Sequence, residues 1–323
     1  VILNWNGCDM LRTFLPSVVR YSEGEGVEVC VADNGSTDTS VSLLQQEFPS
    51  VRTIVLDQNY GFADGYNWAL QQVDAEYVVL LNSDVEVTEH WLEPMIAYLD
   101  AHPEVAACQP KIRSQRQKEY FEYAGAAGGF IDKYGYPFCR GRIMGVVEKD
   151  EGQYDTVIPV FWATGAALFI RHTDYVNVGG LDGRFFAHME EIDLCWRLRS
   201  RNREIVCVPQ SIVYHVGGAT LKKENPHKTF LNFRNNLVLP YKTLPQEELN
   251  KVMRIRTCLD YLAAFNFLLQ GHWDNASAVM RARKEYKRLC PSFSLSREEN
   301  MRKKTLNPIP ERTKSSILWQ FYA

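Results

Sequence analysis

Short apolar runs alternate with stretches of helical periodicity over the first hundred residues. The run at 77–81 is almost continuously apolar, which is typical of a strand buried on both faces of a parallel sheet. Strands are expected at residues 1–3, 27–32, 51–56, 77–81 and 105–108, and helices at 8–21, 39–48, 62–73 and 91–99. Repeated strand–helix units predict an α/β fold with a mostly parallel sheet flanked by helices, in which ligands bind at the carboxyl ends of the strands.

This alternation stops at residues 114–155, which are rich in glycine, tyrosine and charge and indicate hairpins or a mobile insertion. Further strands are expected at 157–162, 166–171, 205–208 and 212–215, and a helix at 190–201. From residue 229 onward the pattern predicts a mainly helical region. We therefore expect a domain boundary near residues 218–228.

The composition favours a folded protein that is soluble or peripheral to a membrane. Hydrophobic residues make up 46% of the 323, which is enough for a large core. With 36 basic and 39 acidic residues the net charge is −3, so the basic excess of a general nucleic-acid binder is missing. No apolar run approaches the roughly 20 residues that span a bilayer.

The eight cysteines include no C-x-x-C pair, and several lie in apolar runs. We interpret them as buried free thiols of a reducing compartment. A structural zinc site needs clustered ligands, which the sequence lacks.

A carboxylate follows the most apolar strand, in the segment Leu80-Leu81-Asn82-Ser83-Asp84-Val85. The carboxyl end of such a strand faces the ligand crevice of a parallel sheet. A hard divalent cation that bridges two phosphates binds one or two carboxylates and keeps several waters, a task that fits Asp84. The alternative is a loop carboxylate that caps the next helix.

The second expected strand ends in Asp33-Asn34-Gly35-Ser36-Thr37-Asp38. A carboxylate at this position can accept a hydrogen bond from a pyrimidine imide, and the helix that follows favours anions at its N-terminus. We assign that function to Asp33, whereas Asp38 is expected only to cap the helix. An ordinary turn is the alternative for both.

Three acids open the helix expected at 190–201: Glu190, Glu191 and Asp193. Asp193 and Arg197 have the i,i+4 spacing of an ion pair, and acids suit a helix N-terminus in any case. Glu190 and Glu191 project in different directions, so one of them can face a cleft and accept a proton from a hydroxyl group.

A histidine ends the strand expected at 212–215, and two glycines follow shortly after it. An imidazole at a strand end can bind a metal ion. A single histidine is more often structural, so the assignment of His215 depends on the other residues.

Seven segments in order resemble glycosyltransferase family 2, which has the GT-A fold, and within it a bacterial rhamnosyltransferase-like branch. They are VILNWNG at 1–7, VADNGSTDTS at 31–40, NYGFADGYNWAL at 59–70, LLNSDVEV at 80–87, FWATGAALFIR at 161–171, GGLDGRFFAHMEEIDLCWRLR at 179–199 and VYHVGG at 213–218. They cover roughly residues 1–240, and their order makes the resemblance specific where one segment would be weak.

The resemblance implies a nucleotide-sugar site and a metal site. Asp33 would read the nucleobase, with Asn59 near the nucleoside. The family's D-x-D position is occupied by Asn82, Ser83 and Asp84. Because Asn replaces its first Asp, Asp84 would be the main carboxylate ligand of Mg²⁺ or Mn²⁺, and His215 matches a second ligand of the family.

The same resemblance implies that Glu191 is the catalytic base, in place of the commoner and shorter Asp. Trp162, Thr164 and Gly165 would line the sugar or acceptor pocket. Helical geometry places Glu190 on nearly the same face as Asp193, where we expect it to serve the acceptor rim or the start of the helix. The pair at 234–235 matches a less well-defined family element and receives no role.

The implied organisation is a catalytic domain at 1–225 and a helical extension at 226–323. Nucleotide-sugar binding would fall in 1–110, and the acceptor and catalytic part in 155–225. The implied reaction is an inverting, metal-dependent transfer from a dTDP- or UDP-linked sugar to a glycan or lipid-linked acceptor. The resemblance also suggests cytoplasmic synthesis of a cell-surface polysaccharide.

Three other functions compete with this interpretation. A sugar-phosphate nucleotidyltransferase should carry a Gly-rich phosphate loop after the first strand, and a dehydrogenase G-x-G-x-x-G, whereas this chain has Asn4-Trp5-Asn6-Gly7-Cys8. A catalytically inactive nucleotide-sugar binding module is the alternative from another class. Retention of Asp84, Glu191 and His215 argues against it.

The helical region contains an apolar set flanked by basic residues. The set is Leu259, Tyr261, Leu262, Phe265, Leu268 and Leu269. The basic residues are Lys251, Arg254 and Arg256 before it, and Arg281, Arg283, Lys284, Lys287 and Arg288 after it. This segment predicts either an interfacial element facing anionic lipid or a helix packed on the catalytic domain or across a homodimer.

Overall fold

The computed structural model describes residues 1–217 and 225–322. Within them a large sheet of nine strands has the order β11-β13-β6-β12-β4-β1-β2-β3, and β5 pairs with β13. The strands are β1 (Ile2–Asn4), β2 (Cys30–Asp33), β3 (Arg52–Val55), β4 (Tyr77–Asn82), β5 (Val85–Val87), β6 (Val105–Ser114), β11 (Ile158–Pro159), β12 (Ala167–Arg171) and β13 (Glu204–His215). Strands β1 to β4 pair in parallel, as predicted, whereas β12 is antiparallel to both β4 and β6.

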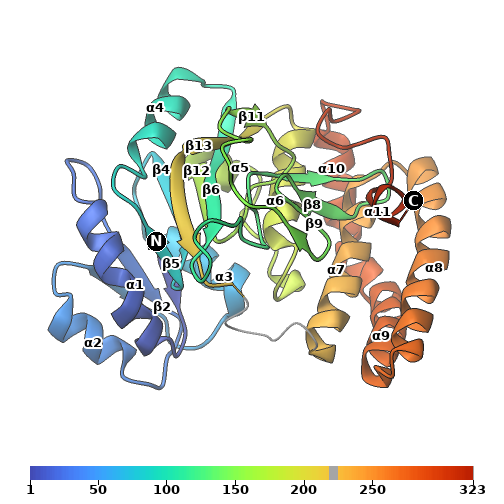
Figure 1. The fold of residues 1–323 in the computed structure, drawn as a ribbon, viewed down its shortest axis with the longest axis horizontal. Coiled ribbons are helices and arrows are strands. Elements are labelled where there is room, and N and C mark those ends of the chain that lie inside the picture. Colours follow the sequence, from blue (N-terminus) through green and yellow to red (C-terminus); the bar gives the residue numbers. More distant parts are fainter. Residues whose placement is uncertain (218–224, 323) are drawn as a thin grey trace.

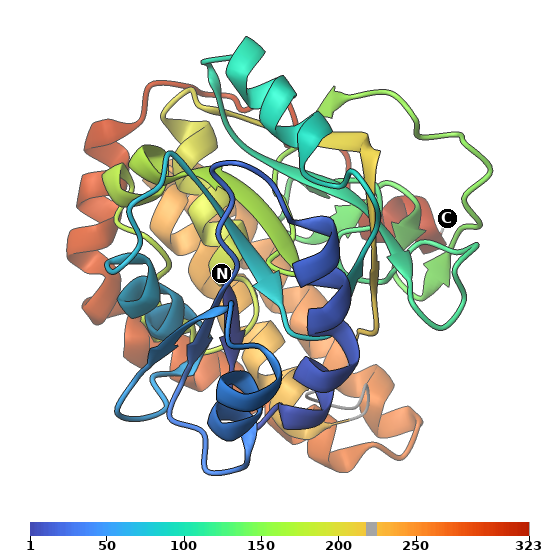
Figure 2. The same cartoon turned by 90° about the vertical axis from the view of Figure 1, so that its left-hand side faces the viewer.

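Helices pack on this sheet, and further helices lie at one end of the molecule. In the first two thirds of the chain they are α1 (Cys8–Tyr21), α2 (Ser40–Glu47), α3 (Gly61–Leu70), α4 (Glu93–Ala101), α5 (His172–Asn177), the 3₁₀ turn η1 (Gly183–Phe185) and α6 (Glu190–Ser200). Figure 2 shows α1 and α2, in blue, in front of the strands. The expected α/β fold is therefore confirmed.

The prediction differs from the structure where polar residues are buried. Strand β6 continues to Ser114, six residues beyond the expected end, although it includes Gln109 and Lys111. The Lys111 ammonium binds the Asp150 carboxylate at 3.0 Å, and Gln109 accepts a hydrogen bond from the Thr164 N–H. Because these partners satisfy the polar groups, the strand stays buried without apolar side chains at those positions.

Two other strand predictions need correction. The strands expected at 205–208 and 212–215 are one strand, β13, with an irregularity between Val208 and Ile212. The strand expected at 157–162 is limited to Ile158–Pro159, because the Phe161 N–H leaves the large sheet and donates to the Gly129 carbonyl.

The glycine-rich segment forms a small antiparallel sheet, in agreement with the predicted hairpins. Its strands are β7 (Gly129–Ile131), β8 (Pro137–Cys139), β9 (Arg142–Ile143) and β10 (Val146–Val147). Lys111 of β6 binds both Asp150 and Asp155, which fixes the end of this segment to the large sheet.

The chain after residue 225 is helical, as expected. Its elements are α7 (Pro226–Thr243), α8 (Gln246–Leu269), α9 (Trp273–Leu289), the 3₁₀ turn η2 (Cys290–Phe293), α10 (Ser294–Lys303) and α11 (Ile317–Tyr322). These helices lie at the end of the molecule opposite α1 and α2 (Figure 1). Leu237 and Leu239 of α7 join the same buried cluster as Trp196 of α6. The predicted boundary at 218–228 falls largely on residues 218–224, outside those described, and the division into two domains stays a prediction.

All eight cysteines are free thiols. Six are buried as predicted, but Cys258 is exposed and Cys290 is partly exposed. Cys258 lies on the outer side of α8, where the apolar run that suggested burial faces outward. No helix in the described part of the chain is long and apolar enough to cross a membrane.

Candidate active site

The carboxyl ends of β2, β1 and β4 bring three polar residues into neighbouring positions. Asn4 pairs in register with Asp33, and Leu3 with Asn82. Asp33 is buried, and its two carboxylate oxygens accept hydrogen bonds from the Asn4 amide at 3.0 Å and from the Ser36 N–H at 2.9 Å. The carboxylate is thus held in a fixed orientation at the strand end where a nucleobase was predicted to bind.

Asn59 lies next to this group but is linked to it through another residue. Its side-chain oxygen accepts hydrogen bonds from the Asn34 amide at 3.0 Å and from the Gly61 N–H at 2.8 Å. Asn34 is itself buried and also accepts from the Tyr60 N–H. The exposed Asn59 is therefore fixed at the start of α3, beside the end of β2.

Asp84 and His215 lie in contact, although 131 positions separate them in the sequence. The His215 Nε2 atom is 3.2 Å from Asp84 Oδ1 and 3.5 Å from the side-chain nitrogen of Asn82. Strand β5 explains this proximity, because His215 pairs with Val85 and the Val216 N–H donates to the Asp84 carbonyl. Ser83, between the two β4-end residues, is half-buried.

Glu122 completes this group, and the sequence analysis did not identify it. One of its carboxylate oxygens lies 3.3 Å from Nδ1 of His215 and accepts a hydrogen bond from the Ala124 N–H. Gly217, at φ +65°, passes so close that a Cβ atom there would lie 2.3 Å from Glu122 Oε1. The glycine after His215 was visible in the sequence, but the carboxylate that requires it lies in the irregular segment before β7.

The donor atoms of Asp84 and His215 fit a divalent cation. Two ligand atoms bound to one ion at about 2.1 Å lie about 3 Å apart when they are adjacent in the coordination sphere. The observed separation is 3.2 Å. Metal-bound histidines usually contact a carboxylate through the other ring nitrogen, which is where Glu122 lies. No group of three or more His, Cys, Asp and Glu side chains suited to a metal ion is found in residues 1–217 and 225–322.

The two carboxylates also determine the charge of His215 in the metal-free protein. Burial by itself would lower the pKa of His215, but the carboxylates of Asp84 and Glu122 outweigh this effect and raise the pKa to about 10. The protonated ring then balances the two acids. Ligation of a metal ion requires the neutral imidazole, so a cation would replace that proton.

Glu190 and Glu191 lie in the first turn of α6, and each carboxylate has an oxygen without a hydrogen-bond partner. The Oε2 atom of each lacks a hydrogen bond. Burial, and then repulsion by Glu191, raise the pKa of Glu190 well above its ordinary value. Burial also raises the pKa of Glu191. Both carboxylates therefore hold a proton more strongly than a glutamate in water.

The surroundings of Glu191 include one predicted pocket residue. A Cβ atom at Gly165 would lie 3.7 Å from the Glu191 Cβ atom and 3.5 Å from the Phe62 ring. Trp162 and Thr164 are placed differently, because both side chains are buried. Trp162 donates its indole N–H to the Phe130 carbonyl at 2.9 Å, and Thr164 packs where a Cβ at Gly125 would clash with it. These two residues therefore expose little surface of their own.

Asp193 differs from Glu190 and Glu191 because its carboxylate forms ion pairs with two cationic side chains. The predicted pair with Arg197 is confirmed at 2.9 Å. Lys242 of α7, which the sequence did not point to, binds Asp193 at 2.7 Å and also Asp182 at 2.7 Å. This buried network attaches α6 to the helical region.

The loop before α6 has an unusual backbone and is held by α7. Phe186, His188 and Met189 all have φ between 68° and 76°, which is strained for residues with a Cβ atom. The Asn235 amide lies 2.8–3.0 Å from three carbonyl oxygens of this loop. Arg234 also donates to one of them, that of Phe185, at 2.7 Å. The pair that received no role from sequence thus fixes the loop that leads into Glu190 and Glu191.

Comparison with known proteins identifies the family. Residues 1–165 match the model of glycosyl transferase family 2. The match covers half of the chain, and the protein belongs to this family.

Curated relatives confirm the resemblance to the rhamnosyltransferase-like branch. The N-acetylglucosaminyl-diphospho-decaprenol L-rhamnosyltransferase of Mycobacterium tuberculosis is 28% identical over 219 residues, which are 64% of this chain and 71% of the relative. The O-antigen biosynthesis protein RfbC of Myxococcus xanthus is 26% identical over 67% of this chain. That match spans only 17% of the longer relative.

A solved structure confirms the GT-A fold. GalNAc-T7 with UDP, GalNAc and Mn²⁺ superposes with a TM-score of 0.58 at 15% identity, over 97% of this chain and 58% of the other. At that identity the likeness concerns the fold alone.

Proposed function

We propose that this protein is an inverting, metal-dependent glycosyltransferase that moves a sugar from a nucleoside-diphosphate donor to a hydroxyl group. The observation that carries the proposal is the 3.2 Å approach of Asp84 Oδ1 and His215 Nε2 at the end of the parallel strands. Two protein ligands leave room for diphosphate oxygens and water on a Mg²⁺ or Mn²⁺ ion. A cation held there would neutralise the charge of the departing nucleoside diphosphate.

The donor would bind along the carboxyl ends of β2, β1 and β4. Asp33, held by Asn4 and Ser36, would accept a hydrogen bond from the imide of a uracil or thymine base. Asn59 would lie near the nucleoside, and Asn82 and Ser83 near the diphosphate. A dTDP- or UDP-linked hexose, rhamnose among them, fits this assignment.

Glu191 would act as the base in a single in-line displacement. Its carboxylate accepts the proton of the acceptor hydroxyl while that oxygen attacks the anomeric carbon. The bond from the anomeric carbon to the diphosphate oxygen breaks on the opposite side, which inverts the configuration. The raised pKa of Glu191 favours proton acceptance, because a stronger base takes the proton more readily.

The acceptor is proposed to be a glycan or a lipid-linked saccharide used in cell-surface polysaccharide synthesis. This is supported by the similarity to a relative named for a diphospho-decaprenol acceptor and to an O-antigen biosynthesis protein. A cytoplasmic site of action, where nucleotide sugars are made, accords with the free cysteines.

The test is donor turnover with and without divalent metal. Nucleotide sugars are first screened by thermal shift with Mn²⁺, because a bound ligand raises apparent stability. The best donor should then release nucleoside diphosphate only when Mn²⁺ or Mg²⁺ is present, and Asp84→Asn should abolish that release. A protein that binds the donor but never cleaves it would be an inactive binding module, and the proposal would be wrong.

The metal site can be tested with a matched pair of variants. Glu122→Gln should weaken Mn²⁺ binding by about 10- to 100-fold, since carboxylates behind a histidine ligand typically have this effect. Glu86→Gln is the control, because Glu86 lies on β5 beside Val85 but pairs with the exposed Lys118. Equal Mn²⁺ affinity in the Glu122→Gln and Glu86→Gln variants would contradict the assignment.

A further inference from the structure

The turn between α8 and α9 exposes a group of large apolar side chains. They are Tyr261, Leu262, Phe265, Leu268, Leu269, Trp273 and Met280, which are between 37% and 71% exposed. We call them the hairpin patch. Exposed apolar patches that extend over several side chains usually mark an interaction surface.

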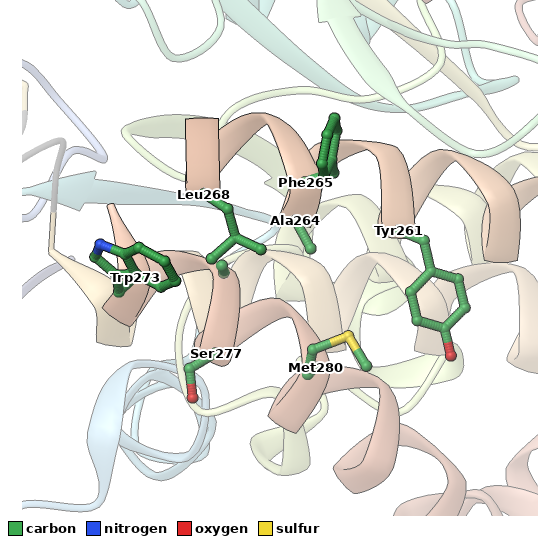
Figure 3. Close-up of a pocket in the computed structure, with 8 residues that line it drawn as sticks. Tyr261, Ala264, Phe265, Leu268, Trp273, Ser277 and Met280 are labelled. Atoms are coloured by element: carbon green, nitrogen blue, oxygen red, sulfur yellow. The ribbon is translucent and has the colours of Figure 1, made fainter. Parts of the chain in front are cut away.

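The contact between the two helices includes a small buried cluster. It consists of Ala264, Ala276 and Val279, and Phe233 of α7 packs against it. Several patch residues instead border an open hollow of about 420 Å³ between the two helices (Figure 3). The first half of α8 packs on the rest of the protein, since Leu249 and Val252 join the buried cluster that contains Trp196, whereas the patch residues stay exposed.

The hairpin patch is uncharged at its centre and surrounded by basic residues. The segment from Tyr261 to Trp273 contains no Asp, Glu, Lys or Arg. From Lys251 to Arg288 there are eight basic and three acidic residues, a formal charge of +5, whereas the whole chain carries −3. Arg256 and Arg283 are used internally by Asp260. The exposed basic residues are Lys251, Arg254, Arg281, Lys284, Lys287 and Arg288.

This combination of an apolar turn and a basic surround favours a bilayer over a second copy of the chain. A symmetric dimer through the patch would bring two positive regions together, which is unfavourable. An anionic lipid surface would attract the same region, and Trp and Tyr side chains suit the boundary between headgroups and acyl chains. We infer that the hairpin patch binds peripherally to the surface of an anionic lipid bilayer.

Lipid binding by the hairpin patch needs neither donor nor acceptor, so the inference stands independently of the proposed function.

The experiment is flotation of the full chain with vesicles of phosphatidylcholine alone or with about a third of phosphatidylglycerol. The protein should float with the anionic vesicles and stay behind with the neutral ones, and raised salt should weaken the binding. The triple change Leu262→Gln, Phe265→Gln and Trp273→Gln should reduce binding by more than about tenfold, because apolar insertion is lost. These side chains are exposed, so the fold should be kept.

Leu295→Gln is the matched control, because Leu295 of α10 is 78% exposed but lies outside the patch. It should bind vesicles as the unchanged protein does. Donor hydrolysis should persist in the triple variant, which distinguishes loss of lipid binding from failure of the proposed activity. Absence of binding to anionic vesicles, equal binding by the triple variant, or a dimer in sedimentation velocity that the triple change dissociates would overturn the inference.

Discussion

Asn235 of α7 donates a hydrogen bond to the carbonyl of His188 at 2.8 Å, two residues before Glu190. Through this contact the helical region controls the loop that precedes the proposed base. The loop contains three non-glycine residues at positive φ, a conformation that persists only when its surroundings hold it. Asn235 is therefore expected to position Glu191 without touching the substrate.

Asn235→Ala should lower kcat by about tenfold or more while donor affinity stays nearly constant, because small displacements of a catalytic group have large effects. Asn236→Ala is the matched control. Asn236 is also buried, but it donates to the Gly135 carbonyl at 2.7 Å, away from the loop. Steady-state kinetics of both variants, with donor binding measured separately, checks the prediction. A similar fall of kcat in both variants would show that Asn235 acts only through general stability.

Lys242 should contribute strongly to stability, because it is buried between Asp182 and Asp193. Lys242→Met leaves the buried Asp193 and the half-buried Asp182 with fewer partners, and about 3–5 kcal/mol of unfolding free energy should be lost. Urea denaturation measures this. Lys303→Met removes an exposed pair with Glu299 and should change the value by less than about 1 kcal/mol. Similar losses of unfolding free energy in Lys242→Met and Lys303→Met would contradict the prediction that the buried ion pairs contribute more than the exposed one.

Glu190 should make stability depend on pH in a defined direction. Burial, and repulsion by Glu191, raise the pKa of its carboxyl in the folded protein. The folded state therefore binds the proton more tightly than the unfolded state, and stability is lost as pH rises from the ordinary glutamate range toward the raised pKa.

Glu190→Gln removes this dependence. Its unfolding free energy relative to the unchanged protein should rise with pH by up to about 1.4 kcal/mol per pH unit within that window, and the difference should vanish near pH 4. Thermal or urea unfolding of both proteins between pH 4 and 9 provides the measurement. A difference that stays constant with pH would mean that Glu190 is not charged differently in the two states.

Much of the fold follows from local patterns in the sequence. Helix α1 has the predicted bounds, because Leu11, Phe14, Leu15 and Val18 recur with helical spacing and are buried on one side. The pattern underestimated β6, whose polar Gln109 and Lys111 are buried with partners that come from distant segments. Hydrophobic periodicity carries no information about such partners.

The candidate site, like the fold, could be predicted only in part from the sequence. Asp84 and His215 were predicted to bind the same metal ion, each from the end of a strand, and the structure places them in contact. Glu122 lies in a segment without periodicity, so nothing in the sequence linked it to His215. The contacts of Asn235 likewise depend on how α7 packs against the loop before α6. The predicted roles of the site residues stay predictions until they are measured.

The most direct test of the account compares turnover of Glu191→Gln and Glu190→Gln with the same donor and acceptor. Glutamine keeps the shape of the side chain but cannot accept the proton. Glu191→Gln should reduce turnover by about 10²- to 10⁴-fold, the usual effect of losing a general base, with little change in donor binding. Glu190→Gln should keep most of the activity. Near-normal turnover in Glu191→Gln with collapse in Glu190→Gln would contradict the assignment of Glu191 as the base.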